Sequence, residues 1–243
     1  MLLLAIDWGN TWVKWRITQQ EQPIEDGRFA PVDTILAFDE IQLKYPALQH
    51  IVMSSVGQSD VFLVELKMRF SAVTILNAQT PAPFTNSYAT PQTLGIDRMV
   101  LAVGAVQLYP NQAALIIDCG SCITYDWLDE MGVYYGGAIS PGISMRYEAL
   151  HQFTARLPLL SPKVPNDFPG NSTADSIHLG VVQSTVYEIE GFMQAQQAKH
   201  ANFILILTGG DAEFLAEQLK SPIFVRPTFQ LEGLCAWYQY LHS

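Results

Sequence analysis

The feature that most constrains the fold of this chain is a motif that occurs twice, once at the start of each half. The first copy is an apolar run, 1–6, followed by Asp7-Trp8-Gly9. The second is the apolar run 113–117, followed by Asp118-Cys119-Gly120, 111 residues further along. Small polar residues and a returning apolar stretch follow each glycine, as in a strand, a tight turn and a second strand. The repeat predicts two similar α/β domains, 1–112 and 113–243, that face each other.

Composition narrows the class of protein. The 243 residues are 49% hydrophobic and 15% charged, which is typical of a globular protein with well-buried cores. The formal net charge is −10 and we find no basic patch, so we expect no binding to nucleic acid, whose phosphates would repel the chain. We also expect no membrane span and no secretory signal. With three cysteines and no such signal, the sequence predicts a cytoplasmic protein without a disulfide framework.

Periodicity and breaker residues outline the remaining elements. We expect a turn at 19–26 and a long loop at 80–93, which holds three prolines. Helical spacing predicts helices at 99–108, 173–199 and 231–241. Because loops of two α/β halves gather at strand ends, ligand chemistry is expected in a cleft between the halves.

Four strand ends carry glycine and could bind phosphate. They are Asp7-x-Gly9, Asp118-x-Gly120, Gly136-Gly137 and Gly209-Gly210. Glycine lets the backbone approach phosphate oxygens, and exposed N–H groups in such turns form anion sites. Carboxylates beside phosphates require cations between them, so the two aspartates imply metal ions. The chain has neither a Walker motif nor Gly-x-Gly-x-x-Gly, which argues against P-loop and Rossmann binding.

The order of these motifs resembles that of type III pantothenate kinases, within the actin, sugar-kinase and heat-shock-chaperone superfamily. The resemblance covers nearly the whole chain. Its motifs are Asp7-x-Gly9-Asn10-Thr11-x-x-Lys14, Gly95-Ile96-Asp97-Arg98, Asp118-x-Gly120-Ser121, Gly136-Gly137-x-Ile139-x-Pro141-Gly142 and Thr208-Gly209-Gly210-Asp211. It implies an α/β protein of two duplicated actin-like (ribonuclease H-like) half-domains with a cleft between them. It also implies ATP-dependent phosphorylation of pantothenate, the first step of coenzyme A synthesis.

The resemblance further implies a role for individual residues. Asp97 matches the general base, Asp7 lies near Mg²⁺, and Asp118 matches the ligand of a monovalent cation, K⁺ or NH₄⁺. Thr173 matches a residue that the partner subunit of a homodimer supplies to the active site at the interface, and Asp211 lies near the nucleoside end of ATP. The implied ATP-binding residues are Asp7, Trp8, Gly9, Asn10, Thr11, Trp12, Val13, Lys14, Ser121, Gly209 and Gly210. The implied pantothenate-binding residues are Tyr88, Gly95, Ile96, Asp97, Arg98 and Thr173.

The residues themselves are compatible with these roles. Phosphoryl transfer depends on positioning and charge neutralisation, so a weakly basic aspartate suffices as proton acceptor. Asp97 at a helix start has its ionised form favoured by the helix dipole, and Arg98 could pair with the pantothenate carboxylate. The plainer interpretation of Asp97-Arg98 is a helix cap.

Three other interpretations stay open at this point. Some relatives are thought to act as accessory transcription factors, although the retained aspartates and the missing basic segment argue against that here. A kinase for a different small alcohol would keep the fold, with Tyr88 and Arg98 arguing for pantothenate. Cys119-x-x-Cys122 could indicate zinc or redox chemistry, but no second ligand pair or redox context accompanies it. Ser121-Cys122 also replaces the family's usual Thr-Ala, and the hydroxyl is kept.

Overall fold

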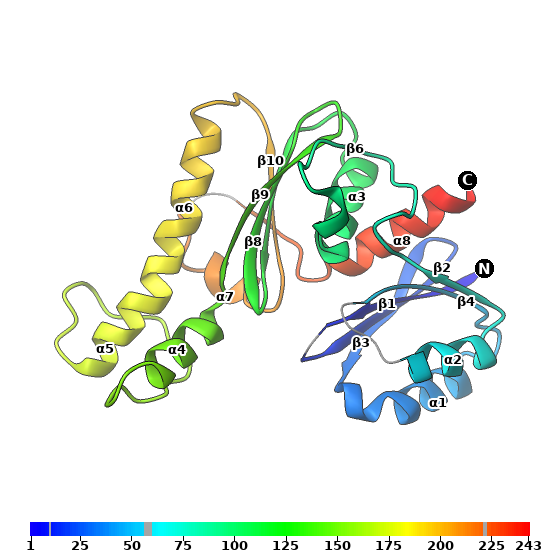
Figure 1. Ribbon diagram of the computed structural model, residues 1–243, viewed down its shortest axis with the longest axis horizontal. Coiled ribbons are helices and arrows are strands. Elements are labelled where there is room, and N and C mark those ends of the chain that lie inside the picture. Colours follow the sequence, from blue (N-terminus) through cyan, green and yellow to red (C-terminus); the bar gives the residue numbers. More distant parts are fainter. Residues whose placement is uncertain (10, 56–59, 221–222) are drawn as a thin grey trace. The chain divides into compact units, whose positions relative to one another are not determined.

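The computed structural model describes residues 1–9, 11–55, 60–220 and 223–243. The chain divides into two compact units (Figure 1). The first comprises Met1–Pro110 with Thr228–Ser243, and the second comprises Asn111–Pro227. Each unit is an α/β structure built on a mixed sheet.

The first unit has a sheet with helices on both faces. Its strands are β1 (Leu2–Trp8), β2 (Val13–Gln19), β3 (Gln22–Phe29), β4 (His50–Ser55) and β5 (Ala72–Ile75), in the order β3-β2-β1-β4-β5. The β1–β2 and β2–β3 pairs are antiparallel, and the β1–β4 and β4–β5 pairs are parallel. Helices α1 (Thr34–Lys44) and α2 (Asp60–Arg69) lie on one face, and α3 (Ile96–Leu108) and α8 (Phe229–His242) lie on the other (Figure 1). Between β5 and α3 come β6 (Thr85–Asn86) and a 3₁₀ turn at Pro91–Thr93, and another 3₁₀ turn, Pro31–Asp33, precedes α1.

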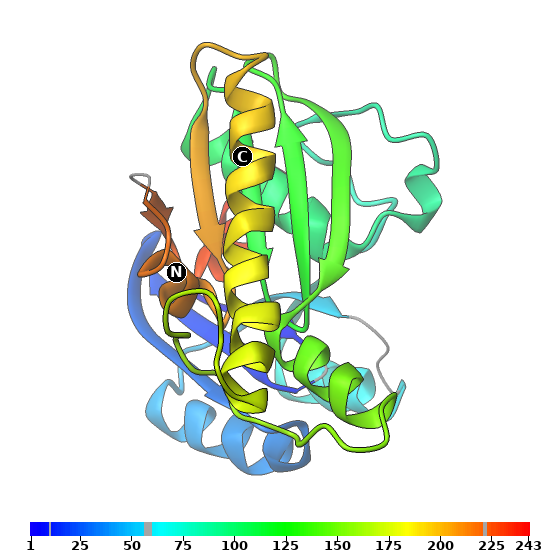
Figure 2. The same cartoon turned by 90° about the vertical axis from the view of Figure 1, so that its left-hand side faces the viewer.

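The second unit repeats this strand arrangement. Its strands are β7 (Ala114–Cys119), β8 (Cys122–Leu128), β9 (Val133–Pro141), β10 (Ile204–Thr208) and β11 (Phe224–Val225), and within the unit they run β9-β8-β7-β10-β11. Again the first three strands are joined antiparallel and the last two pair in parallel. The helices are α4 (Ile143–Gln152), α5 (Thr173–His178), α6 (Ser184–Gln197) and α7 (Ala212–Ala216). A π-helical segment, Leu179–Gln183, joins α5 to α6, and α6 runs along one face of the sheet (Figure 2).

The two copies of the motif occupy equivalent positions. Asp7 pairs with Lys14 on β2 and with Ser54 on β4, at the end of β1. Asp118 pairs with Thr124 on β8 and with Thr208 on β10, near the end of β7. Both central strands are buried on both faces, which explains their nearly continuous apolar sequences.

The structure differs from the expected organisation in two places. The segment expected to be a turn, 19–26, contains a turn at Gln20 and Glu21, both with positive φ, but β3 follows directly from Gln22. The helix expected at 231–241 falls within the predicted second domain, 113–243. In the structure this helix, α8, packs against α3 and β1 of the first unit. None of the helices in the described ranges has the length and hydropathy that crossing a bilayer requires.

Candidate nucleotide and substrate site

Asp7 lies near the end of β1, where burial and neighbouring groups alter its pKa. Ser54 Oγ donates a hydrogen bond to Asp7 Oδ1 over 3.3 Å. Burial raises the pKa of Asp7 to about 6, the charge of Lys14 and the bond from Ser54 oppose this shift, and the negative charge of Asp97 adds to it. Two carboxylates that repel each other in one place are a site that a cation stabilises. Mg²⁺ is usually bound in this way, by one or two carboxylates together with substrate phosphates.

The turn between β1 and β2 has a tight backbone. The N–H of Gly9 donates to the carbonyl of Trp12 over 3.1 Å, and a Cβ on Gly9 would lie 3.0 Å from that oxygen. The side chain of Val13 is fully buried in the core, so this residue can offer a ligand only its backbone. Thr11 is exposed, and Trp12 is 40% exposed with the Arg28 guanidinium 4.7 Å from its ring. Asn10, also predicted to bind ATP, lies outside the described residues.

Asp97 lies in the first turn of α3, and its carboxylate folds back over Gly95. Asp97 Oδ1 accepts a hydrogen bond of 2.9 Å from the backbone N–H of Arg98. A Cβ on Gly95 would be closer to this oxygen than real Cβ contacts allow. No side chain caps α3 at Gly95. The Asp97 carboxylate instead accepts a hydrogen bond from a backbone N–H inside the first turn. A purely structural capping role would therefore use only one oxygen of the Asp97 carboxylate.

Arg98 and Tyr88 come together in the same unit. The Arg98 guanidinium carbon is 5.7 Å from the centre of the Tyr88 ring, and the residue is only 5% exposed. The backbone N–H of Tyr88 donates to the side chain of Asn86 over 3.0 Å, which holds the loop after β6. A mostly buried guanidinium beside an aromatic ring is suited to binding a carboxylate. The structure therefore gathers Asp7, Lys14, Asp97, Arg98 and Tyr88 within the first unit.

The second unit forms a comparable turn around Asp118. The N–H of Gly120 donates to the carbonyl of Cys122 over 3.0 Å. The N–H of Asp211 donates to the carbonyl of Cys119 over 2.9 Å. Gly209 has a φ of 98°, and a Cβ there would collide with Asp118 Oδ1 and with the carbonyl of Cys119. Only glycine therefore lets the backbone pack this closely against the Asp118 carboxylate and the Cys119 carbonyl.

The other predicted residues of this unit lie around that turn or apart from it. Ser121 and Gly210 are exposed, and a Cβ on Gly210 would contact nothing within 4 Å. Burial raises the pKa of Asp211. Thr173 begins α5, where Ser172 Oγ accepts a hydrogen bond of 3.1 Å from Asp175 N, and it is exposed. Thr173 also lines a cavity of about 780 Å³ with residues such as Leu150 and Gly180.

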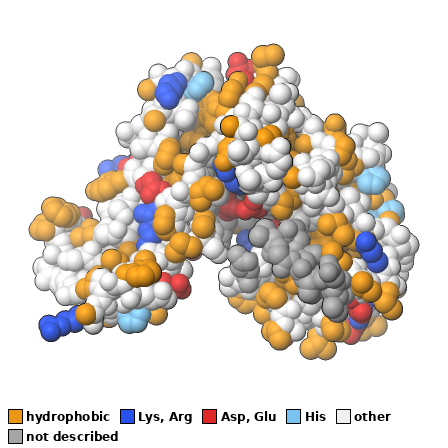
Figure 3. Space-filling model, in the orientation of Figure 1, with side chains coloured by type: hydrophobic (Ala, Val, Ile, Leu, Met, Phe, Trp, Pro, Cys, Tyr) orange, Lys and Arg blue, Asp and Glu red, His pale blue; other side chains and the backbone are white. Residues whose placement is uncertain are grey.

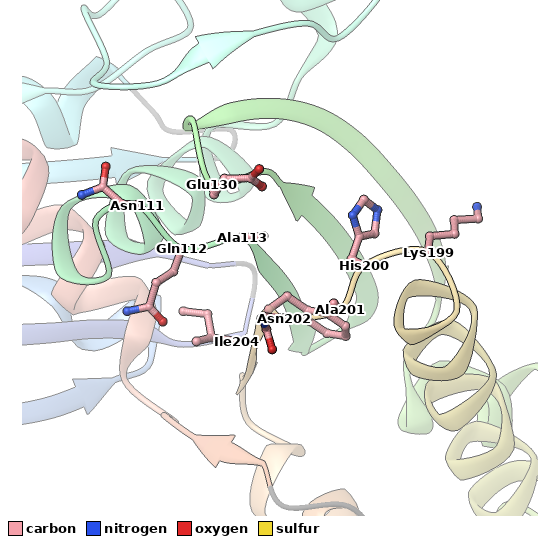
Figure 4. Close-up of a pocket in the computed structure, with 10 residues that line it drawn as sticks. Asn111, Gln112, Ala113, Glu130, Lys199, His200, Ala201, Asn202 and Ile204 are labelled. Atoms are coloured by element: carbon pink, nitrogen blue, oxygen red, sulfur yellow. The ribbon is translucent and has the colours of Figure 1, made fainter.

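Two other features of the second unit are a cavity and the cysteine pair. A cavity of about 540 Å³, drawn in Figure 4, is lined by side chains such as Glu130, Lys199 and His200, and none of the predicted site residues lines it. Cys119 is buried and Cys122 is exposed, and burial raises the pKa of the Cys119 thiol. Within the described ranges no group of three or more His, Cys, Asp and Glu side chains is arranged to bind a metal. The zinc interpretation of the cysteine pair has no support from this geometry.

Two residues near Asp7 and Asp97 were not among the sequence predictions. Ser54 is the second-last residue of β4, and the two serines that close this parallel strand were the available signal for it. Gln230, on α8, donates from Nε2 to the backbone carbonyl of Asp97 over 3.2 Å. No motif marks Gln230, because it follows Asp97 by 133 residues.

Comparison with known proteins identifies the family. A family model described as type III pantothenate kinase matches residues 3–195. The type III pantothenate kinase of Flavobacterium johnsoniae is 46% identical over 244 residues, covering 98% of both chains. Among solved structures, one described as a Baf family transcriptional activator from Campylobacter jejuni has a TM-score of 0.63 at 21% identity and covers 100% of this chain and 99% of its own.

A second solved structure is also similar in fold. It is the activator of 2-hydroxyisocaproyl-CoA dehydratase from Clostridium difficile with bound ADPNP, with a TM-score of 0.56 at 14% identity, covering 99% of this chain and 94% of its own. At such identities the structures establish the fold alone, the actin-like fold of sugar kinases and related ATPases. The family follows instead from the family model and the curated relatives, and by both this chain belongs to the type III pantothenate kinase family.

Proposed function

We propose that this protein transfers the γ-phosphoryl group of ATP to the hydroxyl of pantothenate and so forms 4'-phosphopantothenate, the first step of coenzyme A biosynthesis. The observation that carries the proposal is that Asp7 lies within reach of the charge of Asp97 in the same unit, because that charge helps to raise the pKa of Asp7. One carboxylate can serve a metal bound to phosphate and the other can accept a proton from the alcohol. Family membership supplies the substrate.

Asp97 is the general base in this proposal. It takes the proton of the pantothenate hydroxyl as the oxygen attacks the γ-phosphorus, and ADP leaves. Asp97 Oδ1 is already bonded to the N–H of Arg98, so Oδ2 is the oxygen available for the proton. Arg98, beside the Tyr88 ring, binds the pantothenate carboxylate, and Gly95 and Ile96 line the substrate.

We propose ligands for ATP and its cations in each unit. In the first unit the turn from Asp7 to Lys14 binds phosphate, and Asp7 binds Mg²⁺, which neutralises the phosphate charge when bound. In the second unit Ser121, Gly209 and Gly210 bind the nucleotide, and Asp118 binds K⁺ or NH₄⁺. Asp118 Oδ1 and the carbonyl oxygen of Cys119 both lie beside Gly209, and oxygen atoms of these kinds are the donors that such a cation takes.

We also propose a homodimer in which Thr173 completes the partner's active site. Figure 3 shows hydrophobic side chains at the surface in the region of α4 and α5, at the lower left. Exposed apolar residues of these helices and their neighbours include Met145, Phe153 and Tyr187. Apolar surface of this kind is typical of protein interfaces. The free cysteines, Cys119, Cys122 and Cys235, suit the reducing cytoplasm, where we place the enzyme.

The test is a coupled assay for ADP release with ATP, Mg²⁺, K⁺ and pantothenate. We expect ADP formation that depends on pantothenate, and other small alcohols serve as controls for substrate choice. ADP release with another alcohol and none with pantothenate would reassign the substrate. Asp97→Asn should lower kcat roughly 10²–10⁴-fold if Asp97 is the base. Near-normal turnover by this variant would leave Asp97 as a helix cap only.

The accessory transcription factor is not favoured as an alternative. The curated relatives are named as kinases, and the likeness to the Baf family structure concerns the fold. With a net charge of −10 the chain would be repelled by DNA. A DNA-binding measurement at physiological salt should show no complex.

A further inference from the structure

The first turn of α8 contacts two elements that carry proposed active-site residues. Arg16 lies on β2, the strand that follows the phosphate turn, and its Nη2 donates to Thr228 Oγ1 over 3.0 Å. Arg16 is itself held by two hydrogen bonds of 2.7 Å to Asp26. Two residues after Thr228, Gln230 Nε2 donates to the backbone carbonyl of Asp97 on α3 over 3.2 Å. Arg16, Thr228, Gln230 and Asp97 all belong to the first unit.

Gln230 is placed in a way that stability alone does not explain. The residue is 8% exposed, and its Oε1 is buried without a hydrogen-bond partner among the described residues. Leaving a polar atom buried and unpaired is unfavourable, and an apolar side chain of similar size would avoid this cost. The carbonyl of Asp97 can also accept the regular backbone hydrogen bond of α3, so it does not depend on Gln230 for a partner. The contact is therefore best explained by what it does to Asp97.

The peptide group between Asp97 and Arg98 connects Gln230 to the carboxylate of Asp97. Gln230 donates to the carbonyl of this peptide, and the N–H of the same peptide donates to Asp97 Oδ1 over 2.9 Å. Because the peptide is planar, fixing its carbonyl also fixes the direction of its N–H. The N–H of Arg98 lies in the first turn of α3, and its bond to Oδ1 holds the carboxylate in place.

We propose that Gln230 is a positioning residue that orients the carboxylate of Asp97 through the Asp97–Arg98 peptide. The inference rests on the proposed function, because it assigns Gln230 an effect on the general base. Gln230 does not touch the substrate in this role. It fixes which oxygen of Asp97 stays bonded to Arg98 N and which faces the hydroxyl.

The test is Gln230→Met, which keeps the volume and removes both the hydrogen bond and the buried unpaired oxygen. We expect kcat to fall about 5- to 50-fold, since a small misplacement of a reacting group is costly, with KM for ATP changed less than about twofold. The melting temperature should stay equal or rise. Gln239→Met, on the same helix but away from Asp97, is the matched control and should keep the wild-type kcat. An unchanged kcat in Gln230→Met overturns the inference.

Two further measurements separate positioning from general damage. If Gln230 acts through Asp97, Gln230→Met combined with Asp97→Asn should be no slower than Asp97→Asn alone, whereas independent effects would multiply. Hydrogen exchange of the Arg98 amide should accelerate at least about fivefold in Gln230→Met, because its bond to Oδ1 loosens. Exchange does not require turnover, so inactive wild-type protein would refute the proposed function while the exchange rate still decides the inference. Unchanged exchange overturns it.

Discussion

The missing side chain of Gly95 makes room for the carboxylate of Asp97. Gly95 has a φ of −59° and a ψ of 138°, which any residue can adopt, so Gly95→Ala costs nothing in the backbone. The new methyl would collide with Asp97 Oδ1 and push the carboxylate off the N–H of Arg98. We predict that Gly95→Ala lowers kcat about 10²-fold, as expected when a catalytic group moves by about 1 Å. Steady-state kinetics of the purified variant measures this.

The control for this prediction is the same substitution in open space. Gly191 lies on α6, and a Cβ there would contact nothing within 4 Å. Gly191→Ala should keep the wild-type kcat and gain up to about 1 kcal/mol in free energy of unfolding from its helix propensity. Equal kcat values for the two alanine variants would show that Asp97 does not need its present orientation.

At the residue scale, the sequence predicts side chains in short motifs and misses those that come from elsewhere. The sequence singles out Asp7, Asp97 and Arg98 because each lies two or three residues from a glycine in a recognisable pattern, and their site roles stay predictions. Gln230 cannot be found in this way, since its partner is a backbone carbonyl, which any residue type at position 97 would offer. Its role depends on where α8 packs.

The crossing of α3 and α8 is made by two glycines in contact. A Cβ on Gly104 would lie 3.1 Å from the Cα of Gly233, and a Cβ on Gly233 would collide with the backbone carbonyl of Val100. Backbone atoms cannot move aside as a flexible side chain can, so Gly233→Ala must separate the helices. We predict a loss of about 1–3 kcal/mol in free energy of unfolding, the usual cost of overpacking. Urea denaturation followed by circular dichroism measures it.

Gln239→Ala on the same helix provides the comparison. Gln239 is partly exposed, so this change should stay within about 0.5 kcal/mol of wild type. A Gly233→Ala variant as stable as Gln239→Ala would mean that the close approach of the two helices is not needed.

Elements were predictable from the sequence where burial leaves a pattern. β1 and β7 are buried on both faces and have apolar sequences that indicate them directly. β3 reads Gln-Pro-Ile-Glu-Asp-Gly-Arg-Phe. Its burial alternates, but the less exposed positions of this edge strand include Glu25 and Gly27, so the sequence shows no apolar alternation. The helix α8 was predicted, but its attachment to the first unit requires knowledge of long-range packing with α3.

At the scale of the whole molecule, the repeat of Asp-x-Gly predicts two similar α/β domains, and the strand order adds detail that the repeat does not contain. The order β3-β2-β1-β4-β5 of the first unit recurs as β9-β8-β7-β10-β11 in the second, with Asp7 and Asp118 in matching registers. A subunit partner leaves no such pattern in one chain. Thr173 is an exposed residue at the start of α5, and the proposal that it serves another subunit must be tested between chains.

Mixing two inactive variants tests whether the active site is shared. Asp97→Asn lacks the proposed base, and Thr173→Arg places a bulky cation where the partner's substrate is proposed to bind. In a symmetric dimer formed by co-refolding equal amounts, half of the dimers carry both chains, and each of these has one site with Asp97 from one chain and Thr173 from the other. We predict that the mixture recovers about a quarter of the wild-type activity. If Thr173 served the Asp97 of its own chain, the mixture would show no more activity than the two variants measured separately.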